Sequence, residues 1–179
     1  METNRCTANN RTSHTRAGQG PHHLMLGSVA VSLLLTGDQT RGSLSLVELL
    51  GKPGSGPGPH VDPWQETFYI LDGELTFRVQ DERVVRTVVA HRGDVVSIPQ
   101  GIGHAFSVTS ASPAQFLIAS TPAGIDAFFA DAGEPIPHPA LPTNPPAFDR
   151  ERLRAAFAKH ALAAHSFPDG TAPGTAAAE

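Results

Sequence analysis

Four side chains near the middle of the chain have the types and the spacing to hold a metal ion. His60, Asp62 and Glu66 lie in one short segment, and His104 follows in a second segment. Because His60 and Asp62 are two positions apart, they point to the same face of an extended strand. Glu66 would share that face if the strand simply continued, but Pro63 favours a bend or bulge there. Imidazole and carboxylate groups together suit divalent first-row metals such as iron, manganese or zinc.

The spacing of these residues resembles the two signature motifs of the cupin superfamily. The first motif corresponds to the segment from Gly54 to Gly73, and the second to the segment from Gly93 to His104. The segment PHVDPWQETFYILDGELTF looks most like the single-domain bacterial cupins called quercetin-dioxygenase-like. The resemblance implies an all-β fold, an antiparallel cupin barrel of the double-stranded β-helix or jelly-roll type. It also implies a metal inside the barrel, held by two histidines and a glutamate of the first motif and a histidine of the second.

Two positions depart from the family pattern. Asp62 stands where the family has its second histidine, and Val108 stands where an asparagine is often found. If Asp62 is a ligand beside His60, Glu66 and His104, two carboxylates cancel the charge of a divalent ion and make it a weaker Lewis acid. If Asp62 instead accepts a hydrogen bond from a ligand histidine or a metal-bound water, a triad of two histidines and one carboxylate remains. The third alternative is a barrel that holds no metal.

Counting in twos along the two ligand strands predicts the lining of a cavity. Phe68 and Ile70 share the face of Glu66, and Phe106 and Val108 share the face of His104, whereas Ala105 and Ser107 point outward. Trp64 either rims the mouth of this cavity or packs in the core. An apolar and partly aromatic cavity suits a small hydrophobic or aromatic substrate. The alternative is that these side chains only fill a small barrel.

The composition fits an all-β domain and gives no reason to expect a nucleic-acid partner. The 179 residues include 16 prolines and 17 glycines, and 17% of them are charged, which favours many turns and short strands. The net charge of −4 offers no basic surface for a polyanion. The lone cysteine, Cys6, excludes an intramolecular disulfide and is expected to be neither ligand nor nucleophile.

We expect four parts along the chain. They are a disordered leader (1–20), the cupin β-barrel (21–130), a proline-rich linker with a helix capped by Asp149 and running to about Ala164 (131–166), and a flexible tail (167–179). A short helix with Phe128 and Phe129 is expected to pack on the end of the barrel. The apolar stretch 24–35 is shorter than a membrane span of about 20 residues. Because no small-residue cleavage site follows it, we interpret it as a pair of buried strands and expect a cytoplasmic protein.

Turn residues predict two hairpins. Asp72-Gly73 separates two apolar runs, and Arg92-Gly93-Asp94 separates two more. Six other histidines are expected on the surface or in solvated loops: His22, His23, His91, His138, His160 and His165, the last three of which lack ligand spacing.

The sequence suggests two classes of function, and the first rests mostly on the resemblance to cupins. It is a metal-dependent enzyme for a small apolar, phenolic or polyketide-like metabolite, with one divalent metal per chain, Fe(II) being favoured over Zn, Mn or Ni. In a dioxygenase-like oxidoreductase, substrate and dioxygen take open metal positions and Asp62 is a ligand or a base. In a redox-neutral version, Asp62 or Glu66 moves a proton in a cyclisation, isomerisation or decarboxylation. The second class is a non-catalytic cupin that binds a small molecule. The resemblance also implies a homodimer, and no membrane partner is expected.

Overall fold

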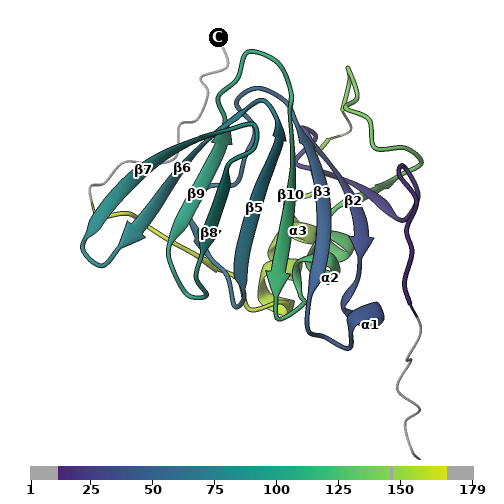
Figure 1. Ribbon diagram of the computed structural model, residues 1–179, viewed down its shortest axis with the longest axis horizontal. Coiled ribbons are helices and arrows are strands. Elements are labelled where there is room, and N and C mark those ends of the chain that lie inside the picture. Colours follow the sequence, from purple (N-terminus) through teal and green to yellow (C-terminus); the bar gives the residue numbers. More distant parts are fainter. Residues whose placement is uncertain (1–11, 146, 169–179) are drawn as a thin grey trace, which may run out of the picture.

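Two antiparallel sheets form the body of the structure, a computed structural model that describes residues 12–145 and 147–168 (Figure 1). Within this part of the chain, one sheet has seven strands, in the order β11 (Glu134–Ile136), β1 (His22–Met25), β2 (Val29–Leu35), β3 (Ser45–Gly51), β10 (Ala114–Thr121), β5 (Gln65–Asp72) and β8 (Val95–Ile98). The other has five, in the order β12 (Ala163–Ala164), β4 (His60–Val61), β9 (His104–Val108), β6 (Glu74–Asp81) and β7 (Val84–His91). This is the all-β fold that the sequence predicts.

The core lies between the two sheets and consists largely of phenylalanine rings. Phe68 of β5 and Phe77 of β6 are both fully buried and meet edge to face, with ring centroids 4.9 Å apart. Phe106 and Phe116 pack on the same cluster. Along β5 the neighbouring Tyr69 is 42% exposed, so the predicted alternation of inward and outward side chains is confirmed. Removing a ring such as Phe68 would cost about 3–5 kcal/mol of stability.

The two predicted hairpins are wrong. The strands on either side of Gly73 belong to different sheets, since β5 pairs with β10 and β8, whereas β6 pairs with β7 and β9. The same holds across Arg92-Gly93-Asp94, where β7 pairs with β6 and β8 pairs with β5. Gly73 has φ +83°, and a Cβ there would lie 2.7 Å from the Cβ of Ala114, so this crossing requires glycine. A turn sequence shows that the chain bends, but not which sheet the next strand joins.

The apolar stretch 24–35 does form buried strands, and they begin earlier than expected. His22 and His23 belong to β1 and are buried, so the prediction that they lie in a solvated loop is wrong. The Nδ1 of His22 lies 2.9 Å from the hydroxyl of Ser32, but neither ring nitrogen of His23 has a hydrogen-bond partner within the described chain. Burial lowers the pKa of His23, and the positive charge of Arg152 adds to this effect.

Three helices accompany the sheets in the described residues. A short helical turn, α1 (Gly37–Thr40), follows β2, while α2 (Ile125–Ala132) and α3 (Arg150–Lys159) pack on one another, with α2 also against β1, β2 and β3 (Figure 1). Phe128 and Phe129 of α2 are buried, as predicted. The carboxylate of Asp149 accepts hydrogen bonds from the first turn of α3, which confirms the predicted cap. The helix ends before Ala164, because the chain then forms β12 beside β4.

The other predicted surface histidines have different environments. His91 is exposed, as predicted. His160 instead contacts the carboxylate of Asp131, and the Nε2 of His165 lies 2.7 Å from the side-chain oxygen of Gln80. Residues 1–11 of the expected leader, including Cys6, and residues 169–179 of the expected tail lie outside the described chain.

Candidate metal centre and its cavity

Strand pairing brings the four predicted ligands together. His60 of β4 stands directly opposite His104 of β9, and their ring centroids are 4.3 Å apart. Asp62 follows β4, and its Oδ2 lies 3.3 Å from the Nε2 of His60 and 3.4 Å from the Nε2 of His104. Glu66 enters from β5, with Oε2 3.5 Å from the Nε2 of His104. All four side chains are buried.

The donor atoms fit a divalent metal ion. Oδ2 of Asp62 and Nε2 of His104 are buried, and neither has a hydrogen-bond partner among the described residues. Orphaned buried polar atoms of this kind are costly unless a cation or water satisfies them. Metal bonds of ~2.0–2.2 Å in tetrahedral geometry place neighbouring ligand atoms ~3.3–3.6 Å apart. The spacings of 3.3 and 3.4 Å from Asp62 to the two histidines match that range. His60, Asp62 and His104 have donor atoms that all lie within 4.8 Å of one another, whereas Glu66 is close to His104 alone among them, at 3.5 Å.

Backbone carbonyls orient both imidazole rings toward the centre. The Nδ1 of His60 lies 2.9 Å from the carbonyl oxygen of Gly58, and the Nδ1 of His104 lies 3.0 Å from that of Ile102. When Nδ1 carries the proton and donates it to the carbonyl, the lone pair of Nε2 is free for a metal. In each case the carbonyl is two residues before the histidine, in the loop that leads into its strand, and its position favours the tautomer that carries the proton on Nδ1.

Trp64 holds the carboxylate of Glu66, a role that the sequence reasoning missed. Its indole Nε1–H donates to Oε1 of Glu66 at 3.2 Å, which leaves Oε2 directed toward His104. Trp64 is buried and packs on Gly124, where an added Cβ would lie 2.4 Å from the indole ring. The spacing of two positions between these residues does not reveal whether Trp64 donates a hydrogen bond to Glu66 or only packs in the core.

The two carboxylates also affect the charge state of His60. Burial acts to lower the pKa of His60, but the close contact with the carboxylate of Asp62 and the negative charges of Asp62 and Glu66 outweigh it, so the pKa is raised above 6.5. A proton and a metal ion therefore compete for this imidazole.

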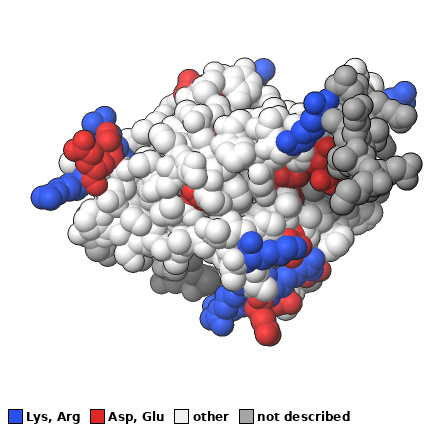
Figure 2. Space-filling view, turned by 90° about the horizontal axis from the view of Figure 1, so that it is seen from below, with Lys and Arg blue, Asp and Glu red and all other residues white. Residues whose placement is uncertain are grey.

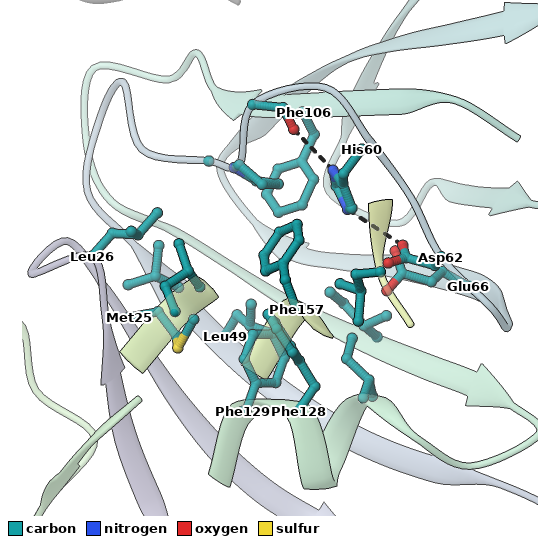
Figure 3. Close-up of a pocket in the computed structure, with 18 of the residues that line it drawn as sticks. Met25, Leu26, Leu49, His60, Asp62, Glu66, Phe106, Phe128, Phe129 and Phe157 are labelled. Atoms are coloured by element: carbon teal, nitrogen blue, oxygen red, sulfur yellow. Dashed lines mark hydrogen bonds and ion pairs between the residues drawn. The ribbon is translucent and has the colours of Figure 1, made fainter. Parts of the chain in front are cut away.

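The metal centre forms one end of a cavity of about 270 Å³. Figure 3 shows His60, Asp62 and Glu66 at one end and the apolar side chains of Met25, Leu26, Leu49, Phe128, Phe129 and Phe157 around the rest. Loop residues 56–59 and the ends of α2 and α3 complete the wall.

The cavity includes only part of the predicted lining. Trp64 and Phe106 line it. Phe68, Ile70 and Val108 do not, and the structure corrects this expectation, because these side chains fill the barrel interior. Ala105 was expected to point outward, but it is buried as well.

Comparisons with known proteins agree with this fold. Residues 48–120 match the family model described as "Cupin domain". The structure resembles a predicted oxalate decarboxylase from Thermotoga maritima (23% identity, 62% of this chain and 99% of that chain, TM-score 0.53). It also resembles a mutant of Bacillus subtilis oxalate decarboxylase (18% identity, 63% of this chain and 31% of that chain, TM-score 0.53). At these identities the likeness shows the fold alone. Residues 48–120 of this chain are therefore a cupin domain.

Curated relatives give a shorter match. The chain is 32% identical over 59 residues to the 3-hydroxyanthranilate 3,4-dioxygenase of Xanthomonas euvesicatoria pv. vesicatoria. This match spans 33% of the chain and 34% of the relative, so the chain covers about a third of the length of that enzyme.

Proposed function

We propose that this protein is a metal-dependent cupin enzyme that acts on a small apolar or phenolic molecule in the cavity. One divalent metal per chain would be held by His60, Asp62, Glu66 and His104. The observation that carries this proposal is the convergence of orphaned, buried donor atoms at the one polar end of an otherwise apolar cavity. A pocket with few polar groups beside a metal is typical of a site that orients a small substrate.

Among reaction types, we favour a dioxygenase-like oxidation with Fe(II). Iron bound there would supply redox chemistry with dioxygen. Asp62 would accept the proton of a substrate hydroxyl. The rings of Phe106, Phe128 and Phe157 would hold the aromatic part of the substrate and exclude water. The matched segment of the 3-hydroxyanthranilate dioxygenase supports this version.

A redox-neutral reaction is the second candidate, and the position of Asp62 favours it. Its carboxylate lies between both histidines and lines the cavity, so it could move a proton while the metal polarises a carbonyl, as in a cyclisation, isomerisation or decarboxylation. Zinc in the purified protein would favour this version, and iron the oxygenase.

Elemental analysis of the purified protein tests the proposal, run beside His60→Ala and Asp62→Ala variants. We expect about one metal per chain, lost in His60→Ala and weakened in Asp62→Ala. His91→Ala is a matched control, because that histidine is exposed and far from the ligand set in the fold. Absence of metal in the unmutated protein, even after divalent ions are added, would overturn the metalloenzyme and leave an acid–base cavity or a small-molecule-binding cupin.

A further inference from the structure

We propose that the cavity selects neutral molecules and rejects carboxylates, an inference that rests on the proposed function and specifies its substrate class. Apart from His60, Asp62 and Glu66, each residue that lines the cavity is apolar, glycine or proline. The indole N–H of Trp64 is already used by Glu66. A substrate anion therefore meets no lysine, arginine or free donor among these side chains.

At the end of the cavity where the metal would bind, no net positive charge offsets the negative charge of an anion. The carboxylates of Asp62 and Glu66 together cancel the charge of a divalent ion, so the loaded centre carries no net positive charge. Without metal, the same two groups repel a third carboxylate. Taking an ionised carboxylate out of water without a cation costs far more than taking in a neutral carbonyl or hydroxyl.

Two arginines, Arg152 and Arg154, adjoin the cavity wall in sequence, and neither lines the cavity. Arg154 is exposed. Arg152 adjoins the lining residue Leu153, but its Nε donates to the carbonyl of Asp131 at 2.8 Å and its guanidinium pairs with Glu134 at 2.9 Å. These contacts fix α3 to the end of α2 and to β11, and they keep this charge out of the cavity.

The volume of the cavity and the segments that supply its wall further restrict the class of substrate. A dry cavity of about 150 Å³ accepts benzene, so about 270 Å³ accommodates one ring with substituents. Much of the wall comes from residues outside the matched domain at 48–120, from the β1–β2 turn and from α2 and α3. The compounds in the names of the similar proteins, oxalate and 3-hydroxyanthranilate, are carboxylates. The substrate of this protein is thus a neutral ring compound with an oxygen donor for the metal end.

Acetophenone and benzoate test this inference, because they have the same number of non-hydrogen atoms and differ in charge. Binding of each is measured by NMR titration at neutral pH, on zinc-loaded and on metal-free protein. We expect acetophenone to bind at least tenfold more tightly than benzoate in both states. Equal or tighter binding of benzoate overturns the inference, and so does a failure of both probes to bind at millimolar concentration.

A variant that places a cation in the wall provides the matched test. Leu153→Lys should gain at least tenfold in benzoate affinity, whereas Leu153→Met, which conserves volume without charge, should keep the original preference. Thermal melting checks that both variants are folded. An unchanged preference in a folded Leu153→Lys variant contradicts the inference, and the acetophenone and benzoate pair on the unmutated protein decides the question if that variant does not fold.

The same experiments separate this inference from the proposed function. Protein that takes up no metal but still prefers acetophenone keeps the inference and overturns the metalloenzyme. Protein that binds one metal and prefers benzoate keeps the metalloenzyme and overturns the inference.

Discussion

Asp62 is the residue at which this site departs from the cupin motif that the sequence resembles. Its Oδ2 lies within 3.4 Å of the Nε2 atoms of both histidines, so it adds negative charge at the point where the ligands converge. A carboxylate in this position would make a bound divalent metal a weaker Lewis acid, since it would neutralise charge that an imidazole leaves in place.

Replacing this carboxylate by imidazole should change the anion preference. We expect Asp62→His to retain one metal per chain and to bind benzoate at least tenfold more tightly than the unmutated protein, because the loaded site would carry a net positive charge. NMR titration of the zinc-loaded variant measures this. Asp81→Asn, at an exposed ion pair with Arg86, is the control and should leave benzoate binding unchanged. A variant that keeps zinc without gaining benzoate affinity would show that the charge of Asp62 does not set the preference.

Trp64 is expected to act as a positioning residue through Glu66. Trp64→Phe keeps an aromatic ring but removes the N–H donor to Oε1, and losing such a partner of a ligand weakens metal binding about 10–100-fold. Competition with a chelator measures the metal affinity. Tyr69→Phe serves as the control, because Tyr69 is at an exposed position of β5, the strand of Glu66.

The unmutated protein supplies a second readout for this residue. Trp64 is the only tryptophan of the chain, so its fluorescence should respond as metal is titrated. Unaltered metal affinity in Trp64→Phe would assign this side chain to packing alone.

At the scale of elements, β1 carries a buried histidine, His23, whose protonation reduces the stability of the fold. The pKa of His23 is lowered in the folded protein, so below about 6.5, its unfolded value, the unfolded state binds more protons. This contribution to stability is complete above that pH and is lost as the pH falls through it. We expect His23→Leu to lose less stability than the unmutated protein between pH of about 7.5 and about 5.5. Urea denaturation at both values measures this, with His91→Leu as the exposed control, and equal losses in both proteins would contradict the prediction.

The other element with a testable end is α3, which supplies Leu153 and Phe157 to the cavity. Asp149 accepts hydrogen bonds from the N–H groups of Glu151 and Arg152 at 3.0 and 2.9 Å. Asp149→Ala should therefore cost about 0.5–2 kcal/mol of stability, whereas Asp149→Ser should retain most of it. Thermal or urea unfolding measures both, and an equal loss in the two variants would show that capping is not the cause.

At the scale of the whole molecule, the surface and the cavity have different characters. The face in Figure 2 is largely uncharged at its centre, and its charged groups of both signs lie toward the margins. Mixed charges of this kind on that face produce no extended positive field of the type that attracts nucleic acid. None of the helices in the described chain is long and apolar enough to span a membrane.

The sequence by itself predicted four candidate ligands that lie together in the fold, and the inward positions of Phe68, Ile70, Phe106 and Val108. These follow from local rules, since a strand alternates its side chains with period two and a motif places donors at fixed spacings. Thus His60, Asp62, Glu66 and His104 converge as predicted, and Asp149 caps its helix.

Only the tertiary structure decided which sheet each strand joins and which side chains enclose the cavity. The turn at Gly73 sends the chain to the opposite sheet, and such long-range pairing depends on packing that no turn sequence encodes. The wall of the cavity joins Met25, Phe128 and Phe157, which are far apart in the sequence. These side chains meet because α2 packs against β1, β2 and β3 and α3 packs on α2, and such packing is a property of the assembled layers.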